Sequence, residues 1–440
     1  MIAVRSLLLI TFVSLAAPAD AQSRLTLDDA IARARAQNRD VSVARSVERE
    51  AAQQLVQARA GYLPRVDFTE AWQRGDHPVF VFSSLLAQRR FAADNFAIDA
   101  LNHPDAIDNF RAAVTLEQAL FDPAVGAGVR AAAVNVESAA ARQTLTSQDL
   151  VVAATSAYGA VLVAVRSQQA AAAALDAARA DRELAANRRD AGLATDADVL
   201  QLDVHLAVMR GQQIRADADE RIARARLNEV MGEPLDAVFA LEPPAESAVV
   251  PPLEPLASLE GEGLKNRADV KLAMLQQELA DAAHDTVRAA FLPQVAVQAG
   301  WEANGGNWQS RSSSWVVGVV GRMNLFRGFA DRARLAEAAE RQTRRATERD
   351  RTETAARLDI RAAVARVEAA RASEEAGRAA AAQARESRRI VRDRYESGLA
   401  DVASLLRAAE SVQQAELREI AAQVEVITAA AALKRALGKQ

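Results

Sequence analysis

Two hydrophobic patterns alternate along the chain, and the first has a period of two residues. Apolar residues occupy every second position at Val66, Phe68, Trp72, Phe110, Ala112, Val114 and Leu116, and again at Val295, Val297, Ala299, Trp301, Trp315, Val317 and Val319. Alternation of this kind is typical of β-strands with one apolar face. We therefore expect two β-hairpins, at about 64–121 and 293–326, with Glu70 and Gln118 as exceptions to the apolar face.

The second pattern is helical. No proline interrupts the chain from about Ala124 to Asp190 or from about Ala330 to Glu396, so each span predicts a helix about 100 Å long. Apolar residues then recur at spacings of three and four, as in Leu417, Ile420 and Val424, which predicts coiled-coil packing. Shorter helices expected at about 41–61 and 270–290 would stack end to end on the returning helices and complete their length.

The chain repeats itself. The segment Gly61–Val66 recurs as Ala290–Val295, 229 positions later, and Leu120-Phe121 recurs as Leu325-Phe326, 205 positions later. The first copy therefore carries about 24 extra residues, within an insertion at about 75–108. We expect a first structural repeat at 22–242, a proline-rich connector at 243–264 and a second structural repeat at 265–440.

The first 21 residues read as a secretory signal peptide. Arg5 precedes an apolar run, and Ala19-Asp20-Ala21 resembles a cleavage site. The alternative is a membrane anchor, but the run is short and ends at Pro18. Beyond it we expect no transmembrane helix. The chain has no cysteine, which excludes disulfides and thiolate metal sites.

The large aromatic residues suggest where the hairpins lie. Trp72 and Trp301 fall at the end of the outgoing strands, and Phe110 and Trp315 at the start of the returning ones, so we expect a lipid-interface aromatic belt at one height. The alternative is a half-buried sheet on a soluble domain. Four strands cannot close a barrel, and hydrocarbon does not tolerate an open edge. Such a chain must oligomerise, and the strand count alone allows a dimer or a trimer.

Glycine interrupts the helical pattern twice, in Gly192-Leu193 and Gly398-Leu399. These tips, at about 190–198 and 396–404, lie where each long helix must reverse, because glycine ends helices with left-handed dihedrals. Thr195 or Asp196 could cap the following helix of the first tip, and Asp401 or Ser404 that of the second. A leucine at a protruding tip is a docking candidate; the alternative is that the tips are only turns.

The duplicated order of helix, hairpin, long helix, turn and helix, with Leu120-Phe121-Asp122, Leu325-Phe326-Arg327 and the paired glycine tips, resembles the TolC family of outer-membrane efflux channels. The resemblance implies a homotrimer whose twelve-stranded β-barrel in the outer membrane continues into a periplasmic α-helical coiled-coil tunnel. It also implies a periplasmic adaptor, docked at Gly192, Leu193, Gly398 and Leu399, and an inner-membrane transporter. The implied periplasmic gate residues are Asp198, Asp401, Ser404 and Arg407.

The resemblance is incomplete at the gate: Asp198 fits the family's pattern, but Ser404 and Arg407 stand where the family uses acidic residues, so the resemblance does not by itself predict an acidic ring.

Enzymatic chemistry is not predicted. The four histidines have no metal-ligand spacing, and no basic face stands out in a chain of net charge -4. We therefore expect no catalytic residue, cofactor, metal or nucleic-acid partner. The leading interpretation is a passive exit channel of a tripartite efflux pump. The alternatives are a type I protein secretion channel and a soluble periplasmic coiled-coil scaffold or adaptor.

Overall fold

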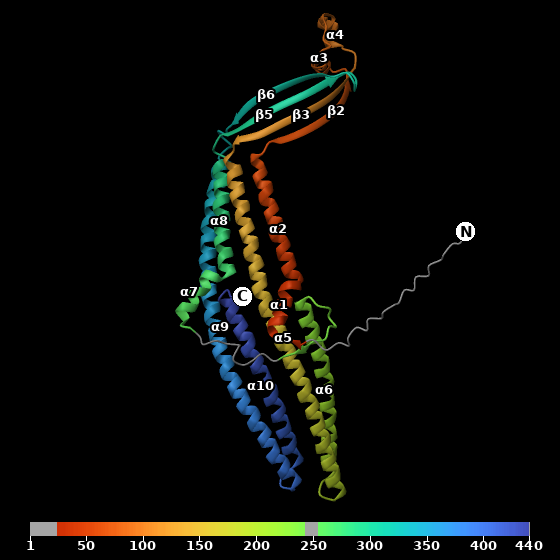
Figure 1. Cartoon of the computed structure of the whole chain (residues 1–440), viewed down its shortest axis with the longest axis vertical. Helices are drawn as coiled ribbons and strands as arrows, with labels where there is room; N and C mark the ends of the chain where they lie inside the picture. The colour runs from red at the N-terminus through yellow and green to blue at the C-terminus, as the bar shows by residue number, and fades with distance from the viewer. Residues whose placement is uncertain (1–23, 243–253, 440) are drawn as a thin grey trace, which may run out of the picture.

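The computed structural model describes residues 24–242 and 254–439. Within them the protein is mainly helical with a small β part, which confirms that coarse prediction. A four-stranded sheet lies at one end, and long helices run from it to two tips at the other end (Figure 1). The predicted signal peptide (1–21) lies outside the described residues, as does the connector from 243 to 253.

Each copy holds two short helices, a hairpin and two long helices. In the first copy these are α1 (Leu27–Gln37), α2 (Arg39–Arg59), β2 (Arg65–Gly75), β3 (Ile107–Phe121), α5 (Pro123–Asp190) and α6 (Asp196–Met231). In the second they are α7 (Leu256–Asn266), α8 (Ala268–Ala289), β5 (Gln294–Gly305), β6 (Ser312–Arg322), α9 (Ala330–Glu396) and α10 (Val402–Ala436). The sequence pattern anticipated α2 and α8 but not the separate helices α1 and α7.

The insertion in the first hairpin is itself folded. It contains α3 (Pro78–Ala87), a short 3-10 turn at Ala93–Phe96 and α4 (Ile98–Asn102). Figure 1 shows α3 and α4 beyond the end of the sheet that faces away from the long helices.

The long helices begin and pack as their sequences dictate. Pro123 occupies the first turn of α5, and the Asp122 carboxylate accepts the N–H of Ala124 at 2.9 Å. Along its 68 residues α5 contacts α2, α6, α8 and α10. Small residues such as Ala154, which is fully buried, allow this close approach. This explains how an alanine-rich chain with few aromatic residues builds a core.

One long helix passes a length and composition test for a membrane span, which is weak evidence on its own. We predicted no transmembrane helix, but α5 is long and apolar enough to cross a membrane, judged by length and composition only. Buried core helices of soluble proteins pass the same test, and α5 has helical partners along its length. The apolar stretch comes from alanine and valine runs that the packing of α5 requires.

A buried tyrosine connects the two ends of the first copy by hydrogen bonds. Strand β1 (Arg24–Leu25) pairs in parallel with β4 (Ala240–Leu241). The fully buried Tyr158 of α5 donates its hydroxyl hydrogen toward the carbonyl oxygens of Leu25, at 2.8 Å, and Glu242, at 2.6 Å. Burial raises the pKa of Tyr158 to about 12.

Replacing Tyr158 with phenylalanine is expected to lower the free energy of unfolding by about 1–3 kcal/mol, because the buried carbonyl of Leu25 and the partly buried carbonyl of Glu242 lose a donor. The neutral phenol stabilises the fold below its unfolded pKa of 10, and this contribution is lost as pH rises toward about 12. Thermal midpoints of both proteins should therefore differ at pH 8 and converge as the pH approaches 12. Equal midpoints at pH 8 would contradict this role.

The four-stranded sheet joins both copies. Its order is β2-β3-β5-β6, all neighbours are antiparallel, and a bulge at Ala119/Phe121 interrupts the β3–β5 ladder. Strands β2 and β6 are the two edges, and among the described residues neither has a second strand partner.

Candidate functional site

The two helical tips share one backbone geometry. Gly192 and Gly398 have φ values of +76° and +74°, in the left-handed region that favours glycine. The N–H of Leu193 donates to the carbonyl of Arg188 at 2.8 Å, and the N–H of Leu399 donates to that of Arg394 at 2.7 Å. These are Schellman-type ends, and they explain why both long helices stop at a glycine.

The helices that follow are capped by one of the two residues anticipated at each tip. Thr195 caps α6 in a reciprocal box with Asp198, whose carboxylate accepts the N–H of Thr195 at 2.8 Å. At the second tip Asp401 caps α10 by accepting the N–H of Ser404 at 2.9 Å. Hydrogen bonds from Ser404 hold the pKa of Asp401 below its ordinary value of 3.8, so this cap persists until the pH falls through that lowered value.

Leucine follows glycine at both tips and faces solvent. The exposed fractions of Leu193 and Leu399 are 68% and 69%. Beneath them lies a shared apolar cluster from both hairpins, made of Ala185, Val199, Leu202, Tyr395, Val402 and Leu405. The tips therefore combine a packed base with a protruding apolar end, which is the form of a docking surface.

An arginine joins the two tips, and the sequence analysis missed it. The Arg188 guanidinium, from the last turn of α5, donates to the carbonyl oxygens of Tyr395 and Glu396 at 2.8 Å each. It also lies 5.1 Å from the centre of the Tyr395 ring. A cation at the C-terminal end of α9 interacts favourably with the carbonyl groups there. Arg188 therefore clamps the first hairpin to the second.

The predicted gate residues lie at these tips, and each forms hydrogen bonds within its own tip. Asp198 and Asp401 are engaged as caps, and the guanidinium of Arg407 donates to the hydroxyl of Ser404 at 3.2 Å. Asp198 and Ser404 lie in the first turns of α6 and α10, Asp401 lies just before α10, and Arg407 lies in the second turn of α10. Their role as a gate stays a prediction.

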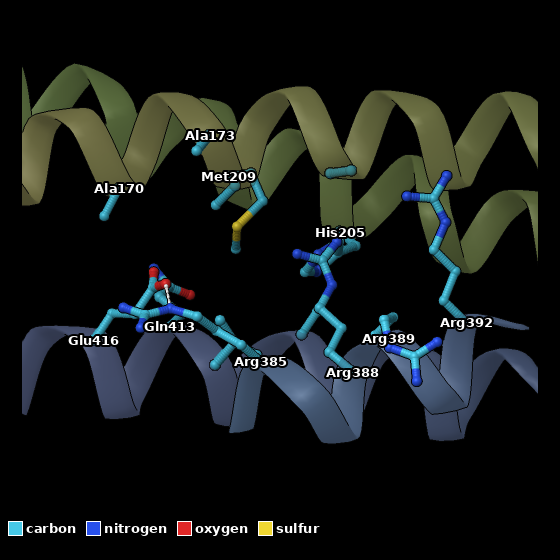
Figure 2. Close-up of a pocket in the computed structure, with 14 residues that line it drawn as sticks. Ala170, Ala173, His205, Met209, Arg385, Arg388, Arg389, Arg392, Gln413 and Glu416 are labelled. Carbon is cyan, nitrogen blue, oxygen red and sulfur yellow. Dashed lines mark hydrogen bonds and ion pairs between the residues drawn. The ribbon is translucent and has the colours of Figure 1, made fainter. Parts of the chain in front are cut away.

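Farther from the tips, a cavity of about 350 Å³ lies between the two helical hairpins (Figure 2). Figure 2 shows Arg388 and Arg392 extending from α9 toward the opposite hairpin. Arg388 lies 3.4 Å from Asp181 of α5, a carboxylate only 4% exposed. Burial lowers the pKa of the neighbouring His205. These contacts form a second, ion-paired link between the hairpins.

The sheet separates apolar from polar side chains onto opposite faces. Phe68, Val114, Trp301 and Trp315 form one cross-strand row, and Val66, Leu116, Ala299 and Val317 form the next row on the same face. The other face carries the Arg111–Glu302 ion pair at 2.9 Å and the Gln298–Glu117 hydrogen bond at 3.4 Å. The apolar face is open, since Trp315 is 77% exposed and Val317 61%. One open apolar face and one charged face are what a strand between lipid and a water-filled lumen requires.

The two exceptions on the apolar face now have partners. The Glu70 carboxylate forms an ion pair with Arg311 at 2.9 Å, beside the turn between β5 and β6. The Gln118 amide donates to the carbonyl of Tyr62 at 3.4 Å, near the helices. Gln118 lies near the helix-side end of β3, whereas Glu70 lies at the middle of β2, where the ion pair with Arg311 compensates its charge.

The four belt aromatics fall into two cross-strand pairs. Trp72 lies opposite Phe110, and Trp301 opposite Trp315. The pairs are offset along β3, since Trp301 opposes Val114 rather than Phe110. Strands tilt in a closed barrel, so residues at one height are displaced along neighbouring strands. The belt stays a prediction.

Comparisons with known proteins agree with this architecture. The model of the family described as outer membrane efflux protein matches residues 30–233 and 260–439. Protein CyaE of Bordetella pertussis is 29% identical over 343 residues, which cover 76% of this chain and 72% of CyaE. The pyoverdine export outer membrane protein OpmQ of Pseudomonas aeruginosa is 27% identical over 274 residues, covering 62% of this chain and 55% of OpmQ.

A solved structure shares the fold over most of the chain. The outer membrane protein VceC of Vibrio cholerae matches with a TM-score of 0.76 and 20% identity, over 94% of this chain and 96% of VceC. Together the matches define a class: an exit channel of the outer membrane that serves an efflux or type I secretion system. The chain belongs to the outer membrane efflux protein family, which confirms the resemblance to the TolC family.

The family and its structural neighbours are channels. Within residues 24–242 and 254–439, no cluster of three or more His, Asp or Glu side chains could hold a metal ion.

Proposed function

We propose that three copies of the chain pool their strands into a closed twelve-stranded barrel in the outer membrane. The four-stranded sheet is the observation that supports this proposal. Its apolar face is exposed, and among the described residues its edge strands β2 and β6 have no second strand partner. In hydrocarbon, unpaired backbone groups at an edge cost several kcal/mol each. Pairing β2 of one copy with β6 of the next removes every edge.

The same assembly would extend the helices into a periplasmic tunnel. Only 39% of the most apolar window of α5 is buried within one chain. Neighbouring copies would cover much of the remainder, because helices of this length need partners all along them. The homotrimer thus provides partners both for the edge strands of the sheet and for the uncovered surfaces of the helices.

The tips are the proposed docking site of a periplasmic adaptor, which in turn would contact an inner-membrane transporter. Leu193 and Leu399 protrude with nearly equal exposure from two tips of the same geometry. Two equivalent apolar points on each of three copies would give the adaptor six contacts around one ring. Asp198, Asp401, Ser404 and Arg407 stand where the chain narrows toward the tunnel entrance in this proposal.

Efflux by a tripartite pump is the leading function, and type I protein secretion is the second. The family description names efflux, and the name of the similar protein OpmQ describes the export of pyoverdine. A soluble periplasmic scaffold is disfavoured by the open apolar face of the sheet, where Phe68 is 67% exposed.

Changing both Leu193 and Leu399 to aspartate is expected to abolish export while the oligomer in the outer membrane is retained. Each charge replaces an apolar contact at the adaptor interface, and neither side chain packs in the tip core. Drug accumulation in cells and the oligomer recovered from outer membranes would measure the two effects.

The matched control is Leu235→Asp, because Leu235 is 62% exposed and lies away from the tips. It should leave export unchanged. Unimpaired export by the double tip variant would refute docking at these leucines.

A further inference from the structure

The junction between β6 and α9 exposes a group of large apolar side chains. It comprises residues 323–329, which follow the end of the sheet nearest the long helices (Figure 1). Leu325, Phe326 and Phe329 are 87%, 71% and 69% exposed. The rings of Phe326 and Phe329 meet edge to face, with their centres 5.4 Å apart. Exposed rings of this size are costly in water, so we expect them to be covered in the membrane.

The backbone at this junction is strained. Phe329 has a φ of +69°, in the left-handed region that bulky residues avoid, and Gly328 before it has a φ of +58°. Strain of this kind persists where the surrounding structure requires it, and it gathers at functional sites. A side chain added at Gly328 would meet no atom within 4 Å, so the turn lies on the surface.

The junction lies at the height of a membrane interface in the proposed barrel. Phe326 follows Trp315, at the outer end of β6, by 11 positions, and the apolar face that carries Val317 leads directly into the junction. At about 3.3 Å per residue and a strand tilt of about 40°, that separation is about 28 Å along the barrel axis. The apolar band of such barrels is about 25 Å tall. With Trp315 at the outer interface, Phe326 therefore lies near the periplasmic one.

Charge distinguishes this junction from its counterpart in the first copy. Residues 322–334 contain four arginines and one aspartate, a net charge of +3. The equivalent residues 205 positions earlier, 117–129, contain Glu117, Asp122 and no basic residue, a net charge of -2. Arg327 stands where the first copy has Asp122. A basic cluster beside an apolar surface favours anionic lipid headgroups.

Two of these arginines are positioned by one buried carboxylate. Asp331 is 6% exposed, and its carboxylate lies 3.2 Å from the guanidinium of Arg334 and 4.0 Å from that of Arg327. The same carboxylate accepts a hydrogen bond from the Asn324 amide. One carboxylate cannot neutralise two guanidinium groups, and both arginine side chains are more than half exposed. The pair therefore offers net positive charge and the donors that a phosphate accepts.

We propose that the β6–α9 junction of each copy binds an anionic phospholipid of the inner leaflet of the outer membrane. Arg327 and Arg334 bind its phosphate, and the rings of Phe326 and Phe329 lie among its acyl chains. This inference rests on the proposed barrel, which sets the junction against lipid. Because the first copy has Asp122 at this place, the site belongs to the second copy alone.

Lipid binding tests the role of the arginines. The probe is phosphatidylglycerol, added to the delipidated complex in detergent, and native mass spectrometry counts the bound lipids. The parent protein should bind phosphatidylglycerol in preference to phosphatidylcholine. Changing Arg327 and Arg334 together to glutamine should weaken phosphatidylglycerol binding about 30-fold, because each arginine near a headgroup contributes roughly a factor of five.

The matched control changes Arg344 and Arg351 together to glutamine. Both are exposed arginines of α9 that lie farther along the helix from the junction. This variant should bind phosphatidylglycerol as the parent protein does. Equal binding by the parent and both variants, or no preference over phosphatidylcholine, would overturn the proposed site.

Fluorescence quenching tests where the rings lie. The chain has no cysteine, so a Phe326→Cys variant carries one thiol per copy for a fluorophore. In vesicles that contain brominated phosphatidylglycerol, its fluorescence should be strongly quenched. Leu399→Cys is the matched control, since Leu399 is 69% exposed at a tip and should not be quenched. An unquenched Phe326→Cys would place the ring in the lumen or against a neighbouring copy and overturn the proposal.

The two proposals fail separately. A fluorophore on Val317→Cys reports on the lipid face of the barrel itself. Quenching at residue 317 without quenching at residue 326, or a trimer whose Arg327 and Arg334 variant binds phosphatidylglycerol as the parent does, overturns the lipid site alone. A single-copy protein in detergent, unquenched at residue 317, overturns the proposed barrel as well.

Discussion

A Val317→Arg variant is expected to be lost from the outer membrane, whereas Val316→Arg is expected to assemble. The two residues are adjacent on β6 and are 61% and 69% exposed, so a soluble sheet would tolerate both changes about equally. In the proposed barrel Val317 faces acyl chains, where an arginine costs about 2–4 kcal/mol near the midplane. Val316 lies opposite Gly300, on the face that carries the ion pairs.

The measurement is the amount of oligomer in purified outer membranes, for three chains expressed at equal levels. The parent and Val316→Arg should give similar amounts, and Val317→Arg much less. Equal recovery of both variants would contradict the proposal that the apolar face contacts lipid. A selective loss of Val316→Arg would indicate instead that the opposite face contacts lipid.

The second large effect is expected at the tips, where Arg188→Ala should open the periplasmic entrance. The side chain is partly buried and makes two charge-assisted hydrogen bonds to the end of α9, each at 2.8 Å. Allowing for solvent screening, the loss of this clamp corresponds to about 1–2 kcal/mol, or roughly tenfold in the balance between closed and open tips. Single-channel conductance or open probability in planar bilayers should rise accordingly.

Arg189→Ala is the matched control for this prediction. Arg189 is the neighbouring residue, but it pairs with Asp190 and Asp196 of its own hairpin. Its removal should leave the conductance unchanged. If both variants behaved as the parent protein does, the Arg188 contact would not hold the tips together.

Local patterns in the sequence predicted the elements whose structure depends on residues close together in the chain. The alternation around Val66 and Val317 marks strands because side chains on a strand alternate between faces. The glycines of both tips mark helix ends because the left-handed conformation is costly for other residues. Proline-free runs bounded by Pro123 and Gly192 gave the long α5 nearly to the residue.

The parts that the sequence could not supply depend on contacts between residues far apart in the chain. Arg188 and Tyr395 are 207 positions apart, and nothing in either segment marks the pair. Glu70 seemed misplaced on an apolar face because its partner, Arg311, is 241 positions away. The two choices left open at the tips were of another kind: propensity allowed two caps at each tip, and the backbone geometry selects Thr195 and Asp401.

The position of α3 also depends on contacts between distant residues. A run of ten uncharged residues suggests only a buried or membrane-facing helix. Its position over the polar face follows from Gln88, Asn109 and Asn304, which come from three elements of the two copies. The position of the insertion on the sheet is therefore set only by the tertiary structure.

The number of copies in the detergent-solubilised protein tests the central claim most directly, since the open apolar face and free edges of the sheet call for pooled strands. Native mass spectrometry of the protein extracted from outer membranes should give three copies of the chain in one complex. A single copy, stable in buffer without detergent, would contradict the account.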